Sequence, residues 1–141
     1  MLERMLVMIK PDAVARSLVG KIIGRIEERG FTIVGLRILK LSQAQAEELY
    51  AMHKNKVFFG RLMKHITSEP VIIMVIEGFE VINGMRKLSG RTDPLNADVG
   101  SIRGSYGLTV TKNAIHSAES PEDAKREIDI SFRSEEIVSV L

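Results

Sequence analysis

The amino-acid sequence predicts an α+β fold, a ferredoxin-like α/β sandwich in which helices cover one four-stranded antiparallel sheet. Strand and helix signals alternate so that two strand–helix–strand units follow one another, which favours this sandwich over a doubly wound parallel sheet. The whole pattern fits within 141 residues, a length suited to one domain with a real core. Neither a sequence repeat nor a linker divides it. We therefore expect a single domain over residues 1–141.

The elements follow from apolar periodicity and from the residues that end each run. Residues 3–9, ERMLVMI, are typical of a buried strand, and Lys10-Pro11-Asp12 ends it. Apolar residues then recur at helical spacing from Leu18 to Ile26, and Gly30 stands where a C-cap is expected. The next elements, in chain order, are expected as a strand at 31–41, a helix at 43–52 capped by Ser42, a short helix at 58–65, a central strand at 71–79 and a helix at 81–88.

The last third of the chain is less regular. A long loop is expected at 89–107, because this segment has no periodicity, and such segments inside compact domains are usually functional. A final strand is expected at 110–115. Ser120-Pro121-Glu122-Asp123 combines a cap serine, a proline in the first turn and an acid three residues after the serine, which predicts a helix start. Residues 133–141 form a short C-terminal tail.

The composition excludes several classes of function. The chain has no cysteine, so disulfides, thiolate nucleophiles and cysteine-based metal sites are ruled out. No apolar run approaches the roughly 18 residues of a membrane span, and we expect a cytoplasmic protein. The net charge of +2 is small and no basic stripe accompanies it, which makes nucleic-acid binding unlikely as a function despite a pI near 9.0.

His116 stands in the stretch NAIHSAES, just before the predicted helix start. A buried, hydrogen-bonded histidine is the more frequent explanation of such a residue, and a catalytic imidazole is the alternative. Glu127, on the following helix, could hold one ring nitrogen and leave the other free as a nucleophile. His53 and His65 lie among charged residues in helical segments, and we expect both on the surface.

Cationic side chains occur where ligand-binding groups tend to converge. Each alone is more often a solvated surface charge, but strand ends and aperiodic loops commonly carry binding residues. Guanidinium forks suit phosphate oxygens, and a lysine supplies a point charge. No GxGxxG and no GxxxxGK[ST] occurs, so a nucleotide would be held by side chains. The candidates are Lys10, Arg86, Arg91 and Arg103, with Thr92 and Asn113 as neutral donors.

Five stretches of the chain, in order and in register, resemble the nucleoside diphosphate kinase family. The resemblance runs from about Met5 to Phe132. One such motif would be weak, but five together are very specific. The stretches are IKPDAVARSLVGKIIGRIEERGF, HKNKVFF, LSGRTDP, GSIRG and NAIHSAESPEDAKREI.

The resemblance implies a ping-pong phosphotransferase that maintains nucleoside triphosphate pools. His116 would take the γ-phosphate of a nucleoside triphosphate on its δ nitrogen and pass it to a nucleoside diphosphate, while Glu127 accepts the ε N–H. Lys10 and Tyr50 match further catalytic positions. Residues matching the nucleotide-binding positions are Lys10, Phe58, Leu62, Arg86, Thr92, Arg103, Val110 and Asn113.

The resemblance also implies the cofactor and the partners. Mg²⁺ would arrive on the nucleotide phosphates, with Glu119 as an outer-shell contact. ATP would be the main donor. Phe58 and Val110 would sandwich the base by apolar stacking alone, and a site without polar readout discriminates weakly between bases. Members of the family assemble as hexamers or tetramers, so the resemblance implies a homo-oligomer. The tail at 133–141 would then contact a neighbouring subunit.

The chain departs from the family pattern mainly beside the histidine. The family continues with Gly or Ala, Ser and Asp, whereas this chain has Ser117, Ala118 and Glu119. The serine missing at 118 is the one that hydrogen-bonds the catalytic glutamate in the family. Val57 and Val99 stand where the family has prolines. Two other functions stay open, a non-catalytic nucleotide-binding module and a basic nucleic-acid-binding domain, although an intact Lys10–His116–Glu127 set argues against the first.

Overall fold

The structure is a computed structural model, and it describes residues 1–140. One four-stranded sheet forms its centre, with the strand order β2-β3-β1-β4 and every neighbouring pair antiparallel. The central strand β1 (Leu2–Ile9) pairs with β3 (Val71–Phe79) and with the short edge strand β4 (Ile115–Ser117), while β2 (Thr32–Leu39) forms the other edge. The predicted ferredoxin-like sandwich is confirmed.

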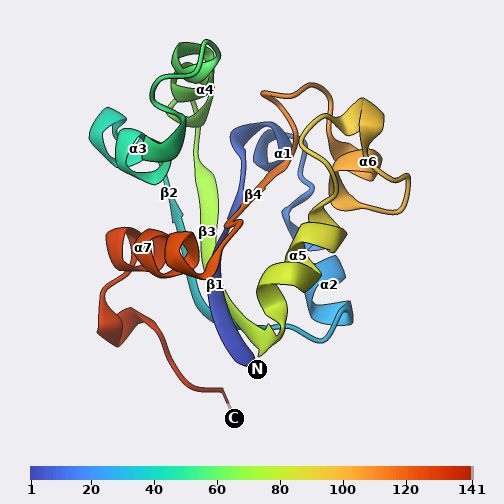
Figure 1. The fold of residues 1–141 in the computed structure, drawn as a ribbon, viewed down its shortest axis with the longest axis vertical. Coiled ribbons are helices and arrows are strands. Elements are labelled where there is room, and N and C mark those ends of the chain that lie inside the picture. The colour runs from blue at the N-terminus through green and yellow to red at the C-terminus, as the bar shows by residue number, and fades with distance from the viewer. Residues whose placement is uncertain (141) are drawn as a thin grey trace.

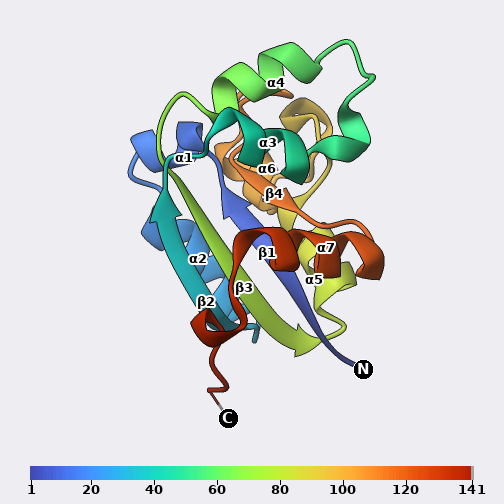
Figure 2. The ribbon, with the colours of Figure 1, turned by 90° about the vertical axis from the view of Figure 1, so that its left-hand side faces the viewer.

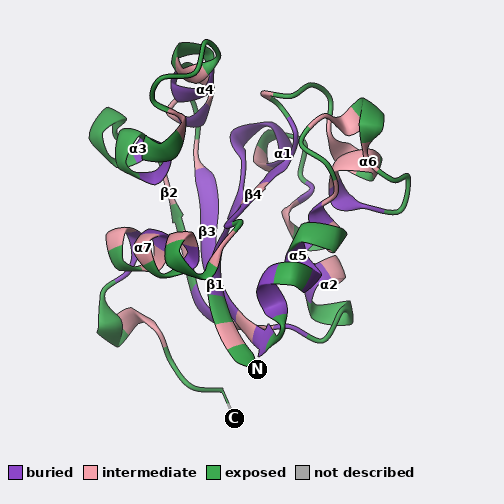
Figure 3. Ribbon diagram, viewed as in Figure 1, coloured by how far each residue is buried: buried purple, intermediate pink, exposed green. Residues whose placement is uncertain are grey.

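Helices cover both faces of the sheet (Figures 1 and 2). Side chains of β1 alternate, so that Met5 and Val7 join one apolar cluster while Leu6 and Met8 join the other. The first cluster lies under α2 (Val19–Glu28) and α5 (Val81–Ser89). The second joins α3 (Gln43–Leu49), α4 (Phe59–Ile66) and α7 (Pro121–Ser131). The buried residues accordingly follow the strands and the inner helix faces in Figure 3.

The capping residues act as the sequence predicts. Ser42 and Gln45 form a capping box at the start of α3. The Ser120 hydroxyl accepts from the N–H of Asp123 at the start of α7, with Pro121 in the first turn. Gly30 ends α2 with φ 94°, a left-handed conformation that favours glycine. The predicted bounds of the regular elements are otherwise off by a few residues at most.

Two predictions about the last third of the chain are wrong in detail. The segment 89–107 is not a plain loop, because it contains a 3₁₀ turn at Pro94–Asn96 and the short helix α6 (Ile102–Tyr106). The strand expected at 110–115 is β4 at Ile115–Ser117, since residues 108–112 close a turn in which the N–H groups of Leu108 and Thr109 both donate to the Lys112 carbonyl. His116 therefore lies inside the strand and not after it.

Short segments complete the chain. Helix α1 (Pro11–Ala15) follows β1 directly, and 3₁₀ turns occupy Ala51–His53 and Ser134–Glu136. The tail returns along β2, where the Val138 N–H donates to the Val34 carbonyl at 2.9 Å. Leu141, the last residue of the predicted tail, lies outside the described residues. Among residues 1–140, none of the helices has both the length and the apolar composition needed to cross a bilayer.

Candidate active site

A cavity of about 410 Å³ opens where β1 ends and β4 begins. Its volume lies within the usual range for small-molecule sites, about 300–1,000 Å³. The cavity brings together segments far apart in sequence, from the end of β1 to α7. It collects eleven of the predicted residues: Lys10, Tyr50, Phe58, Leu62, Thr92, Arg103, Val110, Asn113, His116, Glu119 and Glu127.

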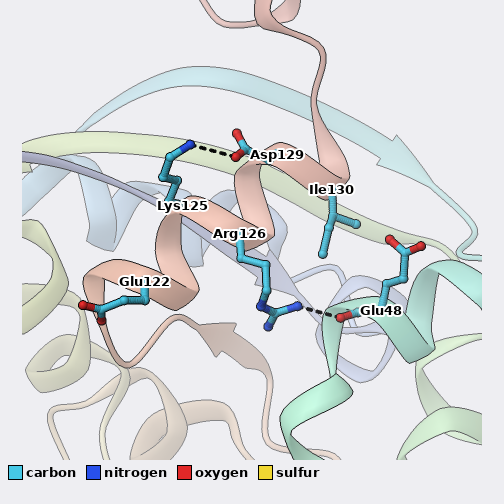
Figure 4. A pocket seen from close by; sticks show the side chains of 6 residues that line it. All are labelled: Glu48, Glu122, Lys125, Arg126, Asp129 and Ile130. Carbon is cyan, nitrogen blue, oxygen red and sulfur yellow. Dashed lines mark hydrogen bonds and ion pairs between the residues drawn. The ribbon is translucent and has the colours of Figure 1, made fainter.

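A second hollow, between α3 and α7, is a weaker candidate (Figure 4). Three of its charged side chains, Lys125, Arg126 and Asp129, already have partners. Lys125 donates to Asp129 at 2.9 Å, and Arg126 donates to the Glu48 carbonyl at 2.8 Å. None of the predicted site residues lines it. The cavity at the end of β1 is therefore the candidate active site.

His116 projects from β4, where it pairs with Met8 of the central strand. Its Nε2 lies 3.0 Å from Oε1 of Glu127, whose side chain is fully buried on α7. A carboxylate accepts hydrogen bonds, so Nε2 carries the proton and Nδ1 keeps its lone pair. No hydrogen bond engages Nδ1 within residues 1–140. The dyad thus engages Nε2 and leaves Nδ1 without a hydrogen-bond partner among the described residues.

The second oxygen of Glu127 is poorly satisfied. Among the described residues, Oε2 is buried without a hydrogen-bond partner. Ala118, which lines the same cavity, has no hydroxyl to offer it. The nearest cation is Arg126, whose Nη2 lies 3.8 Å from Oε2, beyond hydrogen-bonding distance. The departure from the family pattern at residue 118 therefore coincides with an unmet acceptor.

Lys10 stands at the end of β1 with only 4% of its surface exposed. Its Nζ donates to Oδ1 of Asn113 at 2.8 Å, and the Asn113 amide in turn donates to the Thr92 carbonyl. Burial lowers the pKa of Lys10 to about 7, against a partial rise from the Asp12 carboxylate. A buried amine of this kind is poised to gain a proton when an anion enters the cavity.

Arg103 spans the site from α6. It donates to the carbonyls of Gly90 and Ile115, each at 2.8 Å, and so ties the irregular segment to the catalytic strand. Burial lowers the pKa of Arg103, while the neighbouring Tyr50 and Glu119 oppose that effect. The guanidinium is held rigidly by two backbone contacts, an arrangement suited to neutralising phosphate oxygens.

Tyr50 packs against the His116 imidazole, with ring centroids 4.9 Å apart. Its hydroxyl is buried and has no hydrogen-bond partner within the described part of the chain. Burial, reinforced by the nearby Glu127 carboxylate, raises the pKa of Tyr50. The residue is therefore a neutral hydroxyl donor beside His116.

Apolar side chains line the outer part of the cavity. Phe58 is 39% exposed and Val110 is 48% exposed, whereas Leu62 beneath them is buried. Exposed apolar side chains at the mouth of a pocket suit a planar ligand that stacks on them. The Lys56 ammonium lies 5.7 Å from the centroid of the Phe58 ring and adds positive charge at the mouth.

Arg86 and Arg91 are the two candidate residues that lie outside this cavity. Both line an adjoining hollow. Thr92, Arg103 and Glu119 line both hollows, so the two are continuous. A ligand longer than the first cavity would reach Arg86.

Two histidines expected on the surface are not there. His65 has a side chain only 10% exposed, and its Nε2 lies 2.9 Å from Oδ1 of the buried Asp12. His53 lines the active-site cavity, with its ring 5.7 Å from that of Phe58. Burial and the neighbouring Lys56 lower the pKa of His53. One signal could have placed His65 inward, because it stands three residues after Leu62 on the same helix face.

The polar side chains of the site suit a metal ion that enters already bound to a ligand. Within residues 1–140, no three histidine, aspartate or glutamate side chains gather as a metal site. Glu119 is a single carboxylate at the junction of the two hollows. Together with several cations, this arrangement fits a nucleotide whose phosphates hold a divalent ion more closely than the protein does.

The chain matches known proteins over nearly its whole length. The family model described as "Nucleoside diphosphate kinase" matches residues 3–137. A nucleoside diphosphate kinase of Sulfurisphaera tokodaii is 50% identical over 140 residues, 99% of this chain and 95% of that protein. One from Carboxydothermus hydrogenoformans is 51% identical over 138 residues, 98% of this chain and 93% of that protein.

Solved structures give the same result. The Aquifex aeolicus nucleoside diphosphate kinase superposes with a TM-score of 0.96 at 38% identity, covering 98% of this chain and 100% of that one. A halophilic nucleoside diphosphate kinase from Halobacterium salinarum, solved in complex with CDP, gives 0.95 at 40% identity, covering 99% and 93%.

Proposed function

The chain belongs to the nucleoside diphosphate kinase family, and from this premise we propose that His116 carries the phosphoryl group between two nucleotides. The enzyme transfers the γ-phosphate of a nucleoside triphosphate to a nucleoside diphosphate. The observation that carries the proposal is the 3.0 Å contact between His116 Nε2 and Glu127 Oε1, which leaves Nδ1 as a free nucleophile.

The proposed transfer has two displacement steps. In the first, the Nδ1 lone pair of His116 bonds to the γ-phosphorus as the bond to the β,γ-bridging oxygen breaks, and the nucleoside diphosphate leaves with that electron pair. In the second, a terminal β-phosphate oxygen of the acceptor attacks the phosphorus, and Nδ1 recovers its lone pair. The buried Glu127 carboxylate holds the Nε2 proton throughout and stabilises the phosphorylated imidazole.

The surrounding residues supply charge and orientation, which phosphoryl transfer needs more than covalent chemistry. Lys10 and Arg103 would neutralise the transferring phosphate, with Tyr50 and Asn113 as neutral donors beside them. Arg86 would reach the phosphates from the adjoining hollow, which shares Thr92 with the first. Phe58, Leu62 and Val110 would hold the base.

Enzymes of this family typically need a divalent metal, and we assign Mg²⁺ to that role. Bound to the phosphate oxygens, it would neutralise charge on the transferred group. Glu119 lines both hollows and would accept hydrogen bonds from waters around such an ion. Lys10 and Arg103, which line the same cavity, would orient the phosphates.

The assembly, location and domain extent are also proposals. We expect one domain over residues 1–141 with 133–141 as its tail, a cytoplasmic location, and a homo-oligomer, hexamer or tetramer. Leu36 and Ile38 support the oligomer, because they are 55% and 68% exposed on the edge strand β2. Native mass spectrometry at micromolar concentration tests it, and a monomer there would contradict the assembly.

A two-stage labelling experiment tests the central proposal. ATP labelled in the γ-phosphate is added to the enzyme alone, the excess is removed, and an unlabelled diphosphate is then supplied. We expect about one phosphate per chain, labile in acid and stable in alkali, that moves to the acceptor. Label that survives acid, or that does not leave on adding the acceptor, would refute a phosphohistidine intermediate. A chain that binds ATP without labelling would be a binding module.

The enzyme should accept every common base. ATP, GTP, CTP, UTP and TTP should differ in kcat/KM by less than about tenfold, because the walls Phe58 and Val110 offer stacking without polar readout. Steady-state kinetics with each donor and one fixed acceptor measure this. A preference of about a thousandfold for one base would show a polar contact to the base edge and contradict the stacking model.

Restoring a hydroxyl at residue 118 should speed the enzyme modestly. The Ala118→Ser side chain would face the unmet Oε2 of Glu127, and a single hydrogen bond is worth about 0.5–1.5 kcal/mol. We expect kcat to rise about two- to twelvefold, whereas Glu127→Ala should lower it by more than that gain. Steady-state kinetics at saturating ATP decide. A slower Ala118→Ser enzyme would mean that Ser117 or a water already supplies the missing donor.

A further inference from the structure

Asp12 is a buried carboxylate that the proposed mechanism does not use. It belongs to α1, immediately after the end of β1, and its side chain is 3% exposed. Each of its oxygens has a partner on a different element. Oδ1 lies 2.9 Å from Nε2 of His65 on α4, and Oδ2 accepts from the backbone N–H of Ala114 at 3.0 Å. We call these three residues the Asp12 clasp.

Ala114 is held in a conformation that alanine rarely adopts. Its φ is 76°, and the N–H of Ile115 donates back to the Asn113 carbonyl at 2.9 Å, which closes a γ-turn around it. A γ-turn with positive φ is strained, because the left-handed region is unfavourable for an L-residue. The turn lies two residues before His116, so its geometry sets where β4 and the imidazole begin.

Contacts from both sides keep this strained turn in place. Oδ2 of Asp12 takes the Ala114 N–H, and the backbone N–H of Lys10 donates to the Ala114 carbonyl at 2.9 Å. Strained backbone persists only where its surroundings determine it, and such strain often accompanies active sites. The Asp12 carboxylate is the only side chain among residues 1–140 that holds the turn at its N–H.

His65 connects the same carboxylate to the wall of the nucleotide cavity. It stands on α4, whose N-terminal end carries Phe58 as the cap residue and Leu62 one turn later. Both of those residues line the cavity. Asp12 therefore joins the helix that bears the proposed base-binding wall to the turn that precedes the proposed nucleophile.

We propose that Asp12 and His65 are positioning residues for phosphoryl transfer, fixing α4 with its bound nucleotide relative to His116 on β4. The inference rests on the proposed role of His116. Reacting atoms must lie within about 3–3.5 Å and in line, and a misplacement of about 1 Å costs up to about a hundredfold in rate. The clasp sets that spacing without touching the nucleotide.

The electrostatics favour an ionised clasp. Burial acts to raise the pKa of Asp12, but the hydrogen bond from His65 and the charge of Lys10 outweigh it and hold that pKa below its usual range. An ionised carboxylate makes stronger hydrogen bonds to both partners than a neutral group would.

Single-turnover phosphorylation of His116 by saturating ATP, with nucleotide affinity measured separately, tests the proposal. His65→Leu should slow phosphorylation about three- to tenfold, and Asp12→Ala about ten- to a hundredfold, with ATP Kd changed less than about threefold. His65→Gln should recover most of the rate, because its amide N–H reaches the same oxygen. Lys64→Gln, on the exposed face of the same helix, is the matched control and should match the wild type.

Coupling between the two positions separates positioning from general stability. In the Asp12→Ala background, His65→Leu should cause no further loss of rate, since the two act through one carboxylate. Equal losses in both backgrounds, or a His65→Gln enzyme as slow as His65→Leu, would overturn the proposal. The proposal would also be overturned if weaker ATP binding accounted for the whole loss of phosphorylation rate in these variants. If Asp12→Ala does not fold, the three His65 and Lys64 variants still decide. A wild-type enzyme that forms no phosphohistidine would refute the proposed function, a distinct result.

Discussion

Replacing His116 by alanine should lower phosphoryl transfer by about four orders of magnitude or more, because the step that stores the phosphate on Nδ1 is lost. Nucleotide binding should change less than about threefold, because the phosphate cations and the stacking walls do not depend on the imidazole. Lys10 keeps its bond to Asn113, and Arg103 keeps its two backbone contacts. Steady-state kinetics with ATP and a diphosphate acceptor, together with equilibrium binding of ADP, measure the two quantities.

The matched control is the other imidazole in the same cavity. His53→Ala should still form the acid-labile intermediate, since His53 has no carboxylate behind it comparable to Glu127 and lies toward the cavity mouth beside Phe58. If His116→Ala retained the label and His53→Ala lost it, the nucleophile would be His53. Equal ADP affinity in wild type and His116→Ala would confirm that the loss is in chemistry and not in folding.

Replacing Lys10 by methionine should have two large and opposite effects. Phosphoryl transfer should fall about a hundred- to a thousandfold, because a cation directed at the transferring phosphate is removed from a water-poor site. The melting temperature of the nucleotide-free protein should rise by about 5–10 °C, because burial lowers the pKa of Lys10 to about 7 and its charged form is unfavourable in the empty fold. The charged form of Lys10 therefore destabilises the nucleotide-free fold, and a bound phosphate should offset that effect.

The pH dependence of stability follows from the same group. The folded pKa of Lys10 is about 7 and the unfolded value is 10.5, so between these limits the unfolded chain binds more protons. The contribution of Lys10 to the free energy of unfolding consequently rises as pH increases from about 7 to 10.5. The Lys10→Met protein should lack this rise, whereas Lys21→Met, at an exposed lysine on α2, should keep it. Thermal melts of the three proteins between about pH 6 and 9 test whether the rise depends on Lys10.

Activity should show the opposite trend. In the free enzyme, a charged Lys10 attracts the phosphates, so kcat/KM should decline as pH rises through the Lys10 pKa of about 7. Bound nucleotide should raise the protonated fraction of Lys10. The decline of kcat with increasing pH should therefore occur at a higher pH than the decline of kcat/KM. If kcat and kcat/KM declined at the same pH, these roles of Lys10 would be contradicted. A Lys10→Met enzyme less stable than the wild type at pH 7 would contradict them as well.

The sequence predicts the regular part of this fold well, because its signals there are local. The apolar run at 71–79 coincides with β3, and the Ser42 and Ser120 caps begin helices where they were expected. The strand expected at 110–115 is displaced, because the β-branched residues near Val110 close a turn and line the cavity instead of pairing. Strand propensity reflects packing against neighbours that sequence alone does not reveal.

The site residues that lie within one sequence motif could be predicted from the sequence. Contacts between residues far apart in the sequence could not. His116 and Glu127 lie in one stretch, and the resemblance places them together. Asp12 and His65 are far apart in sequence, and each reads alone as an ordinary polar residue. Arg86 lies in the adjoining hollow for a related reason, since the relation of α5 to α6 depends on how the segment between them folds. Pairings of this kind arise only from the tertiary fold.

The position of β1 in the sheet has a consequence for how the chain folds. β1 comes first in the sequence but lies between β3 and β4, so both of its partners come much later in the chain. Closing such distant pairs costs loop entropy before any contact compensates for it, which is characteristic of slower folders. A ribosome-bound fragment ending before Ile115 would leave β1 with an open apolar edge, a site for chaperone binding or aggregation. The sheet is completed only when β4 emerges, and because β4 carries His116, the chain gains its last strand and its proposed nucleophile together.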